Sequence, residues 1–230
     1  GLITVHGPIT PGTDLSLQNG GAGSRGIEIN APIDASGHAL LLQSGGAVTQ
    51  AAAGAPLRAG SLLLNGTQPA SRFMLNDAFN DVQTLAMRFD APRDAAIAGA
   101  GNVEYANNGA LTIGAVTVGG AAPQATAIDA PTGMPGQPVA VVSPGSSVAG
   151  ELRLFSRNGN LRLTQDIATS DGDILLATPQ LLDNAGGNSL SPGNGHRWSV
   201  WAGTWVGETR GGLAPTTPRP NYYGCDQIGR

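Results

Sequence analysis

The stretch "GIEINAPIDASGHALLL", residues 26–42, holds two apolar pairs separated by a polar turn that contains glycine. Ile27 and Ile29 are two positions apart, and Leu40 and Leu42 repeat that spacing after a third apolar residue. Apolar residues at i and i+2 face the same side of a β-strand. The stretch therefore predicts short strands, each with one buried face, joined by tight turns.

Two further stretches follow the same plan: "LITVHGPITPGTDLSL", residues 2–17, and "NLRLTQDIATSDGDILL", residues 160–176. Weaker copies read "SLLLNG", "RFML", "GALTIG" and "GELRLFS". Equivalent leucines recur 20–25 residues apart, at Leu15, Leu40, Leu62 and Leu85. This period in a glycine-rich strand sequence is typical of a solenoid, in which each coil buries its apolar face against the next.

The predicted fold is all-β, a right-handed parallel β-helix (β-solenoid) with coils of 20–25 residues and almost no helix. Leucine-rich repeats share the period, but the Asn that they need after a Leu-x-Leu strand does not recur here. We expect "IEI", "LLL", "SLLL", "LRL" and "ILL" to stack in parallel, with Ile29 and Leu163 facing inward and Glu28 outward. A thin aliphatic core would explain why aromatic residues make up only 4% of the chain.

All three tryptophans lie in "HRWSVWAGTW", residues 196–205. Because the end of a solenoid exposes strand edges and apolar interior, this segment predicts an aromatic carboxy-terminal cap on the last coil. The alternative is a surface on which sugar rings stack. The residues that would contact a partner or glycan there are Trp198, Trp201, Trp205, Arg197, Tyr222 and Tyr223.

The pattern divides the chain into four parts. Residues 1–118 and 139–195 are predicted to form β-helix coils. Residues 119–138, rich in Ala, Pro and Gly, are expected to form a loop insertion that leaves the coil and either binds a partner or is merely tolerated. Residues 196–230 are predicted to form the Trp-rich cap and a Pro-rich tail.

Composition and charge exclude several classes. A net charge of −4 without a basic cluster argues against nucleic-acid binding. No apolar run reaches the ~20 residues of a membrane helix, so membrane insertion is not expected. With 35 glycines, 16 prolines, 40% hydrophobic and 12% charged residues, the chain fits short strands and turns better than disorder.

The acidic residues do not suggest catalysis. Asp171 and Asp173 flank a turn glycine, where Asp is common, and Asp77 and Asp81 form the other close pair. The paired Asp, Gly-His-Gly and Arg-x-Lys signatures of polygalacturonases are missing, and all twelve basic residues are arginine. Histidines do not recur at equivalent repeat positions. We therefore predict no catalytic residues, no metal site and no cofactor.

The order of the repeats resembles a known family. The run "NAPIDASGHALLLQSGGAVTQAAAGAPLRAGSLLLNG", followed by "DVQTLA", "GALTIGAV" and "GDILLAT", is similar to the repetitive passenger of filamentous-haemagglutinin-like exoproteins. The closing "RWSVWAGTWVGETRGGL" is similar to the segment that ends such helices. The amino-terminal secretion module of the family is missing, so the chain resembles a carboxy-terminal portion.

The resemblance implies two-partner secretion, in which an outer-membrane pore exports the chain to the cell surface or the medium. It also implies a structural or adhesive role that contacts a host or neighbouring-cell surface, a glycan, or other copies in a surface assembly. A carbohydrate-binding or carbohydrate-acting β-helix that uses the tryptophan cluster is the alternative.

The single cysteine, Cys225, follows this cap in "YYGCDQIG". One cysteine cannot form an internal disulfide, so it either joins a second chain or stays a thiol. The hypothesis is an intermolecular disulfide. The alternative is a small apolar group packed against Tyr222 or Tyr223.

Overall fold

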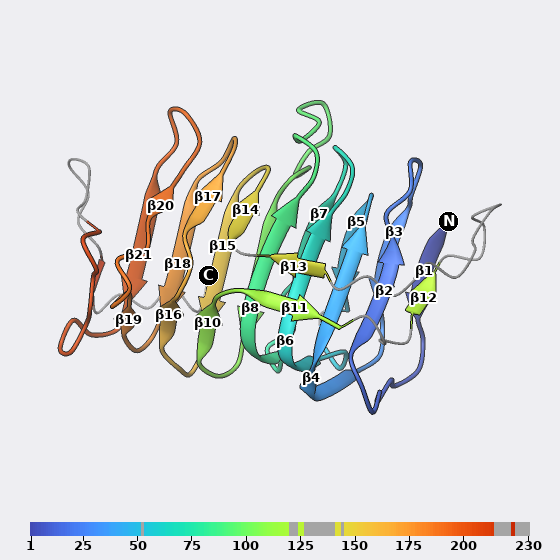
Figure 1. Cartoon of the computed structure of the whole chain (residues 1–230), viewed down its shortest axis with the longest axis horizontal. Helices are drawn as coiled ribbons and strands as arrows, with labels where there is room; N and C mark the ends of the chain where they lie inside the picture. Colours follow the sequence, from blue (N-terminus) through green and yellow to red (C-terminus); the bar gives the residue numbers. More distant parts are fainter. Residues whose placement is uncertain (52, 120–123, 127–140, 144, 214–221, 224–230) are drawn as a thin grey trace.

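The computed structural model describes residues 1–51, 53–119, 124–126, 141–143, 145–213 and 222–223. Parallel strands stack as a β-solenoid of about 7 turns with coils of about 24 residues, and the described residues form no helix. Figure 1 shows the coils following one another along the long axis, with the N-terminal strands at one end. The predicted fold class is confirmed.

The described residues form four sheets. Sheet A contains, in spatial order, β1 (Leu2–Val5), β3 (Gly26–Ile29), β5 (Ala47–Gln50), β7 (Arg72–Leu75), β9 (Val103–Asn107), β15 (Leu152–Ser156), β18 (Ile174–Thr178), β21 (Trp198–Ala202) and β22 (Tyr222–Tyr223). Sheet B contains β12 (Gln124–Thr126), β2 (Leu15–Asn19), β4 (Ile33–Ser44), β6 (Leu57–Gly66), β8 (Asp81–Phe89), β10 (Leu111–Ile113), β16 (Leu161–Leu163) and β19 (Leu182–Asp183). Sheet C pairs β11 (Val116–Val118) with β13 (Val141–Ser143), and sheet D contains β14 (Ser146–Val148), β17 (Ile167–Thr169) and β20 (Leu190–Ser191).

Equivalent residues of successive coils stack in register inside the solenoid. In sheet B the ladder runs through Leu15, Leu40, Leu62, Leu85, Ile113 and Leu163. In sheet A it runs through Ile3, Ile27, Val48, Phe73, Val103, Leu152, Ile174 and Trp198. The predicted leucine repeat is confirmed, and so are the inward positions of Ile29 and Leu163 and the exposure of Glu28.

The phase assigned to residues 160–176 is wrong. In residues 26–42 the first apolar pair lies in sheet A and the second in sheet B, but in residues 160–176 this order is reversed. The five predicted strands all stack in parallel, as expected, with "IEI" and "ILL" in sheet A and the other three in sheet B. The i, i+2 pattern is the same on every buried sheet face, so it cannot distinguish one sheet from another.

The core is mostly aliphatic, but it also holds aromatic rings. Phe73 and Tyr105 are completely buried, and the half-buried Phe89 ring packs edge-on against Phe73 with centroids 5.8 Å apart. The Tyr105 hydroxyl donates a hydrogen bond of 3.0 Å to Asn107 Oδ1, and burial raises the pKa of Tyr105 well above its ordinary value. The predicted aliphatic core therefore also accommodates aromatic rings in the middle coils.

Asn and Asp side chains at the corners link neighbouring coils. Asn80 Oδ1 accepts the backbone N–H of Leu57 at 2.8 Å, and Asn107 Oδ1 accepts that of Val82 at 2.8 Å. Such bonds satisfy backbone donors at places where the chain turns and regular sheet pairing stops.

Within the segment expected to be a loop insertion at 119–138, the described residues 124–126 form strand β12 of sheet B, and β11 and β13 flank the segment. After β11, strand β12 pairs in parallel with β2 of an N-terminal coil, and β13 returns antiparallel to β11. Figure 1 shows β11 and β13 crossing over sheet B while β12 lies beside the first coils. The prediction of a loop leaving the coil is therefore incomplete, although residues 120–123 and 127–140 lie outside the described residues.

Strand β11 covers an apolar patch on the outer face of sheet B. Leu41, Leu63 and Ala86 point away from the main core, and all three are buried against Val116 and Val118. We call this group, together with Ala39, the covered patch.

Candidate binding surface on sheet A

The outer face of sheet A is polar and open along the solenoid. Its central row consists of residues in register on eight successive strands: Thr4, Glu28, Thr49, Met74, Glu104, Arg153, Leu175 and Ser199. Each of these side chains is exposed or half-buried. The row faces outward because successive side chains of a strand point to opposite faces, and the residues on either side of each row residue fill the core.

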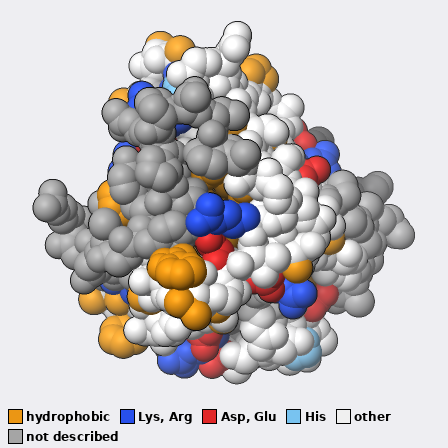
Figure 2. All heavy atoms as spheres, turned by 90° about the vertical axis from the view of Figure 1, so that its left-hand side faces the viewer, with side chains coloured by type: hydrophobic (Ala, Val, Ile, Leu, Met, Phe, Trp, Pro, Cys, Tyr) orange, Lys and Arg blue, Asp and Glu red, His pale blue; other side chains and the backbone are white. Residues whose placement is uncertain are grey.

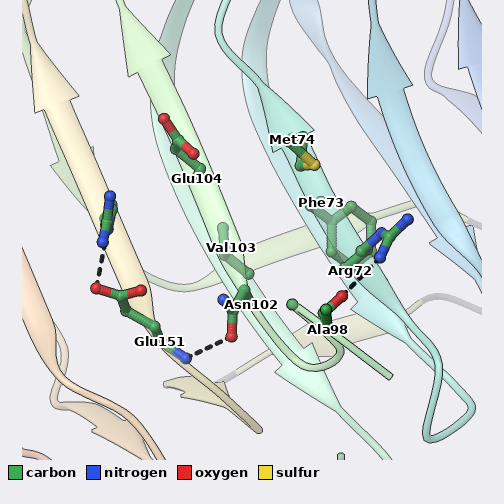
Figure 3. A pocket seen from close by; sticks show the side chains of 10 residues that line it. Arg72, Phe73, Met74, Ala98, Asn102, Val103, Glu104 and Glu151 are labelled. Atoms are coloured by element: carbon green, nitrogen blue, oxygen red, sulfur yellow. Dashed lines mark hydrogen bonds and ion pairs between the residues drawn. The ribbon is translucent and has the colours of Figure 1, made fainter. Parts of the chain in front are cut away.

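A hollow of about 400 Å³ opens on this face across β7, β9 and β15. We call it the sheet A hollow. Its charged lining residues are Arg72, Glu104, Glu151 and Arg153. The uncharged ones are Phe73, Met74, Ala98, Gly99, Asn102 and Val103. Figure 3 shows Arg72 and Met74 on one side of β9 and Glu151 on the other.

Hydrogen bonds fix part of this lining. Arg153 Nε lies 2.9 Å from Glu151 Oε1, and the Glu151 backbone N–H donates to Asn102 Oδ1 at 2.9 Å. The Glu151 hydrogen bond, followed by the charges of Glu151, Glu104 and Asp173, raises the pKa of Arg153. On the opposite wall, Arg72 Nη1 donates to the Ala98 carbonyl at 2.8 Å, which ties the β8–β9 connection to β7.

A second charged cluster lies where the chain turns into sheet A. His196 lies between two carboxylates, with Nε2 3.1 Å from Asp171 Oδ1 and Nδ1 3.2 Å from Asp173 Oδ1. Asp171 Oδ2 also accepts Arg93 Nε at 2.6 Å. The Arg93 hydrogen bond and then the His196 hydrogen bond lower the pKa of Asp171.

The cluster brings together residues from three turns that lie far apart in the sequence: Arg93, the pair Asp171 and Asp173, and His196. Asp171 and Asp173 were expected only as turn residues, and His196 lies about one coil further along. This spacing was the signal in the sequence, because residues one coil apart become neighbours. No group of three or more His, Cys, Asp or Glu residues within the described ranges could hold a metal ion.

The other acidic pair consists of Asp77 and Asp81, which lie in different surroundings. Asp77 is buried, and its carboxylate accepts the N–H groups of Phe79 at 2.8 Å and Ala55 at 3.1 Å. Asp81 is exposed at the start of β8, in register with Arg58. The two carboxylates therefore have different environments.

The tryptophans do not form a single surface. Trp198 ends the sheet A core ladder and packs against the core, as a cap residue should. Trp201 lies on the opposite face of β21, half-buried, while Trp205 follows that strand and is 66% exposed. Trp198 and Trp201 therefore cannot stack on one ligand, because a strand directs them to opposite sides.

The remaining predicted site residues surround this end. The backbone N–H of Arg197 donates to Asp173 Oδ1 at 2.9 Å. Tyr222 and Tyr223 continue sheet A as β22, paired with Trp201 and Ala202. Cys225 lies outside the described residues, so its predicted disulfide stays a prediction. Figure 2, which looks onto this end, shows hydrophobic side chains at the surface beside charged ones.

Comparisons with known proteins found no matching family model, no matching curated protein and no matching solved structure. The resemblance to filamentous-haemagglutinin-like exoproteins therefore stays a prediction. Among the described residues there is also no helix of the length and apolarity needed to cross a membrane.

Proposed function

We propose that this chain is a structural or adhesive β-solenoid of an exported bacterial surface protein, and that the outer face of sheet A is its contact surface. The observation that carries the proposal is the difference between the two long faces. Sheet A presents an open polar row with a hollow, whereas β11 covers the apolar patch on sheet B.

The architecture suits attachment because it places side chains in fixed rows about 4.8 Å apart. A rigid sheet loses little conformational entropy when a partner binds, so the gain from each contact is retained. The partners that fit the proposal are a host or neighbouring-cell surface, or further copies in a surface assembly. Catalysis is not part of the proposal.

Export through a partner pore in the outer membrane belongs to the same proposal. Its support is the order of the repeats and the tryptophan-containing ending, which resemble those of two-partner-secretion passengers. The proposed location is the cell surface or the surrounding medium.

A carbohydrate-binding role is the second candidate. The observation that favours it is the 66% exposure of Trp205, because an exposed indole is a common stacking surface for sugar rings. Such a site would lie at the C-terminal end of the solenoid rather than on sheet A.

Adhesion of beads coated with the chain to cell monolayers tests both candidates. If sheet A makes the contact, Arg153→Glu should reduce adhesion strongly, and soluble chain should compete. Arg162→Glu is the matched control, because Arg162 faces outward from sheet B and also has a carboxylate 3.4 Å away, on Asp183. Loss of adhesion in Trp205→Ala alone would favour the carbohydrate candidate, and unchanged adhesion in Arg153→Glu would refute the sheet A contact.

A further inference from the structure

The charges in the sheet A hollow are separated into a basic side and an acidic side. Arg72 has no carboxylate within ion-pair distance among the described residues, and Glu104 has no cation within that distance there. Around Arg153, the carboxylates of Glu151, Glu104 and Asp173 all act on one guanidinium. The β9–β15 side of the hollow is therefore acidic and the β7 side is basic.

The positions of these two charges follow from the register of the strands. Glu104 pairs with Met74 across β9 and β7, and Arg72 lies two residues before Met74 on the same outer face. Arg72 and Glu104 are therefore diagonal neighbours, about 8 Å apart at the backbone, because neighbouring strands lie about 4.8 Å apart and residues i and i+2 about 6.6 Å apart along a strand. In an extended peptide, side chains at i and i+2 share a face and lie about 6.6 Å apart.

We propose that the sheet A hollow binds an extended peptide segment that carries an acidic and a basic side chain two residues apart. The acidic side chain pairs with Arg72 and the basic one with Glu104, while their aliphatic stems contact Met74, which is 46% exposed. The inference rests on the proposed contact role of sheet A and names the class of partner that this part of the face recognises.

Charge complementarity selects a peptide over the other candidate ligands. A neutral glycan satisfies neither charge, and a polyanion would place negative charge beside Glu104, Glu151 and Asp173. An all-cationic segment would place a positive charge beside Arg72, which repels it. Only a ligand with both signs at strand spacing matches the whole hollow.

The test is the binding of the full chain to short synthetic peptides by calorimetry or fluorescence anisotropy. The peptides share a Thr-rich extended background and carry Asp-x-Lys, Lys-x-Lys or Asp-x-Asp at the centre. The unaltered chain should bind Asp-x-Lys about tenfold more tightly than the other two. Arg72→Glu should prefer Lys-x-Lys, and Glu104→Arg should prefer Asp-x-Asp.

Controls separate recognition from folding. Arg72→Gln and Glu104→Gln should lose the discrimination while unfolding at nearly the same temperature as the parent, and Arg162→Glu should keep it. Equal binding of all three peptides, or no detectable binding of any, would overturn the inference. Adhesion that persists in that case would leave the proposed function standing, so the two failures can be told apart.

Discussion

On the outer face of sheet B, Leu63 is completely buried under β11, whereas on the outer face of sheet A Met74 is 46% exposed. Both residues point away from the solenoid core, from neighbouring strands of the chain. The difference between the two faces is the strand β11, which forms a second layer over sheet B. Sheet B is covered over β4, β6 and β8 by a strand from a distant part of the chain, whereas the central row of sheet A is exposed or half-buried on every strand.

The sequence marks this difference in the residues between the core positions. Covered strands carry runs such as "LLL" at 40–42 and 62–64, where the outward residue is as apolar as its neighbours. Open strands alternate, as in "IEI" at 27–29 and "LRL" at 161–163. Outward apolar residues in register on successive strands, as at Leu41, Leu63 and Ala86, therefore predict a covering element, whereas the separate outward residues Met74 and Leu175 on sheet A do not.

The largest expected effect comes from placing an amide under the covering strand. Leu63→Asn buries an unsatisfied polar group and leaves a cavity, so it should reduce the free energy of unfolding by about 4 kcal/mol. Met74→Asn is the control on the open face and should stay within about 0.5 kcal/mol. Chemical denaturation measures both. Similar losses for the two variants would mean that β11 does not protect sheet B.

A moderate effect is expected from trimming the covering strand itself. Val118 is buried against the covered patch, so Val118→Ala should cost about 1–2 kcal/mol. Its exposed neighbour Thr117 provides the matched control, since Thr117→Ala removes no buried contact. Thermal unfolding measures both variants. A larger loss of stability for Thr117→Ala than for Val118→Ala would contradict the assignment of Val118 to the covered patch.

Asp14 fixes the position of the covering segment by polar contacts. Its Oδ1 accepts the Ala39 N–H at 2.8 Å and its Oδ2 accepts the Gly119 N–H at 2.8 Å. Asp14→Ala removes both acceptors and should cost about 2 kcal/mol. Asp14→Asn keeps one acceptor oxygen and should cost about half as much. If denaturation gave the two variants the same stability, only one of the hydrogen bonds would matter.

The smallest effect concerns the charged cluster beside sheet A. The hydrogen bonds from Arg93 and His196 lower the pKa of Asp171 below its ordinary 3.8, so the folded state favours the carboxylate. This contribution is present above pH 3.8 and is lost as the pH falls through the lower folded value. The difference in melting temperature between the parent and Asp171→Asn should shrink below that pH. A difference that stays constant down to strongly acidic pH would rule out this linkage.

Much of the fold follows from the sequence because core positions repeat in register. The leucines at 15, 40, 62 and 85 were identified from their spacing alone, and they form one ladder. The phase error in residues 160–176 arose because apolar pairs in sheets A and B look alike. The return of residues 124–126 to β2 is a pairing between distant residues, which no local pattern encodes.

The candidate site was less accessible to sequence reasoning. Arg72, Glu104 and Arg153 occupy ordinary outward positions, and only the stacking of coils brings them together. The tryptophans were predicted to cap the last coil, and Trp198 packs against the core as that prediction requires. The clustered tryptophans marked the C-terminal end of the solenoid, whereas the residues that line the hollow form no motif in the sequence.

The pairing of β12 with β2 also determines the order in which the coils fold. Most coils need only the next coil to complete their sheets, so they can form soon after they are synthesised. The N-terminal edge of sheet B must wait, because the contact from Gly119 to Asp14 spans 105 residues of chain. Until then that edge is an unpaired template for other strands. The coil that contains β2 is therefore among the last of the described coils to be finished, and closing this long loop is a slow step that most of the other coils avoid.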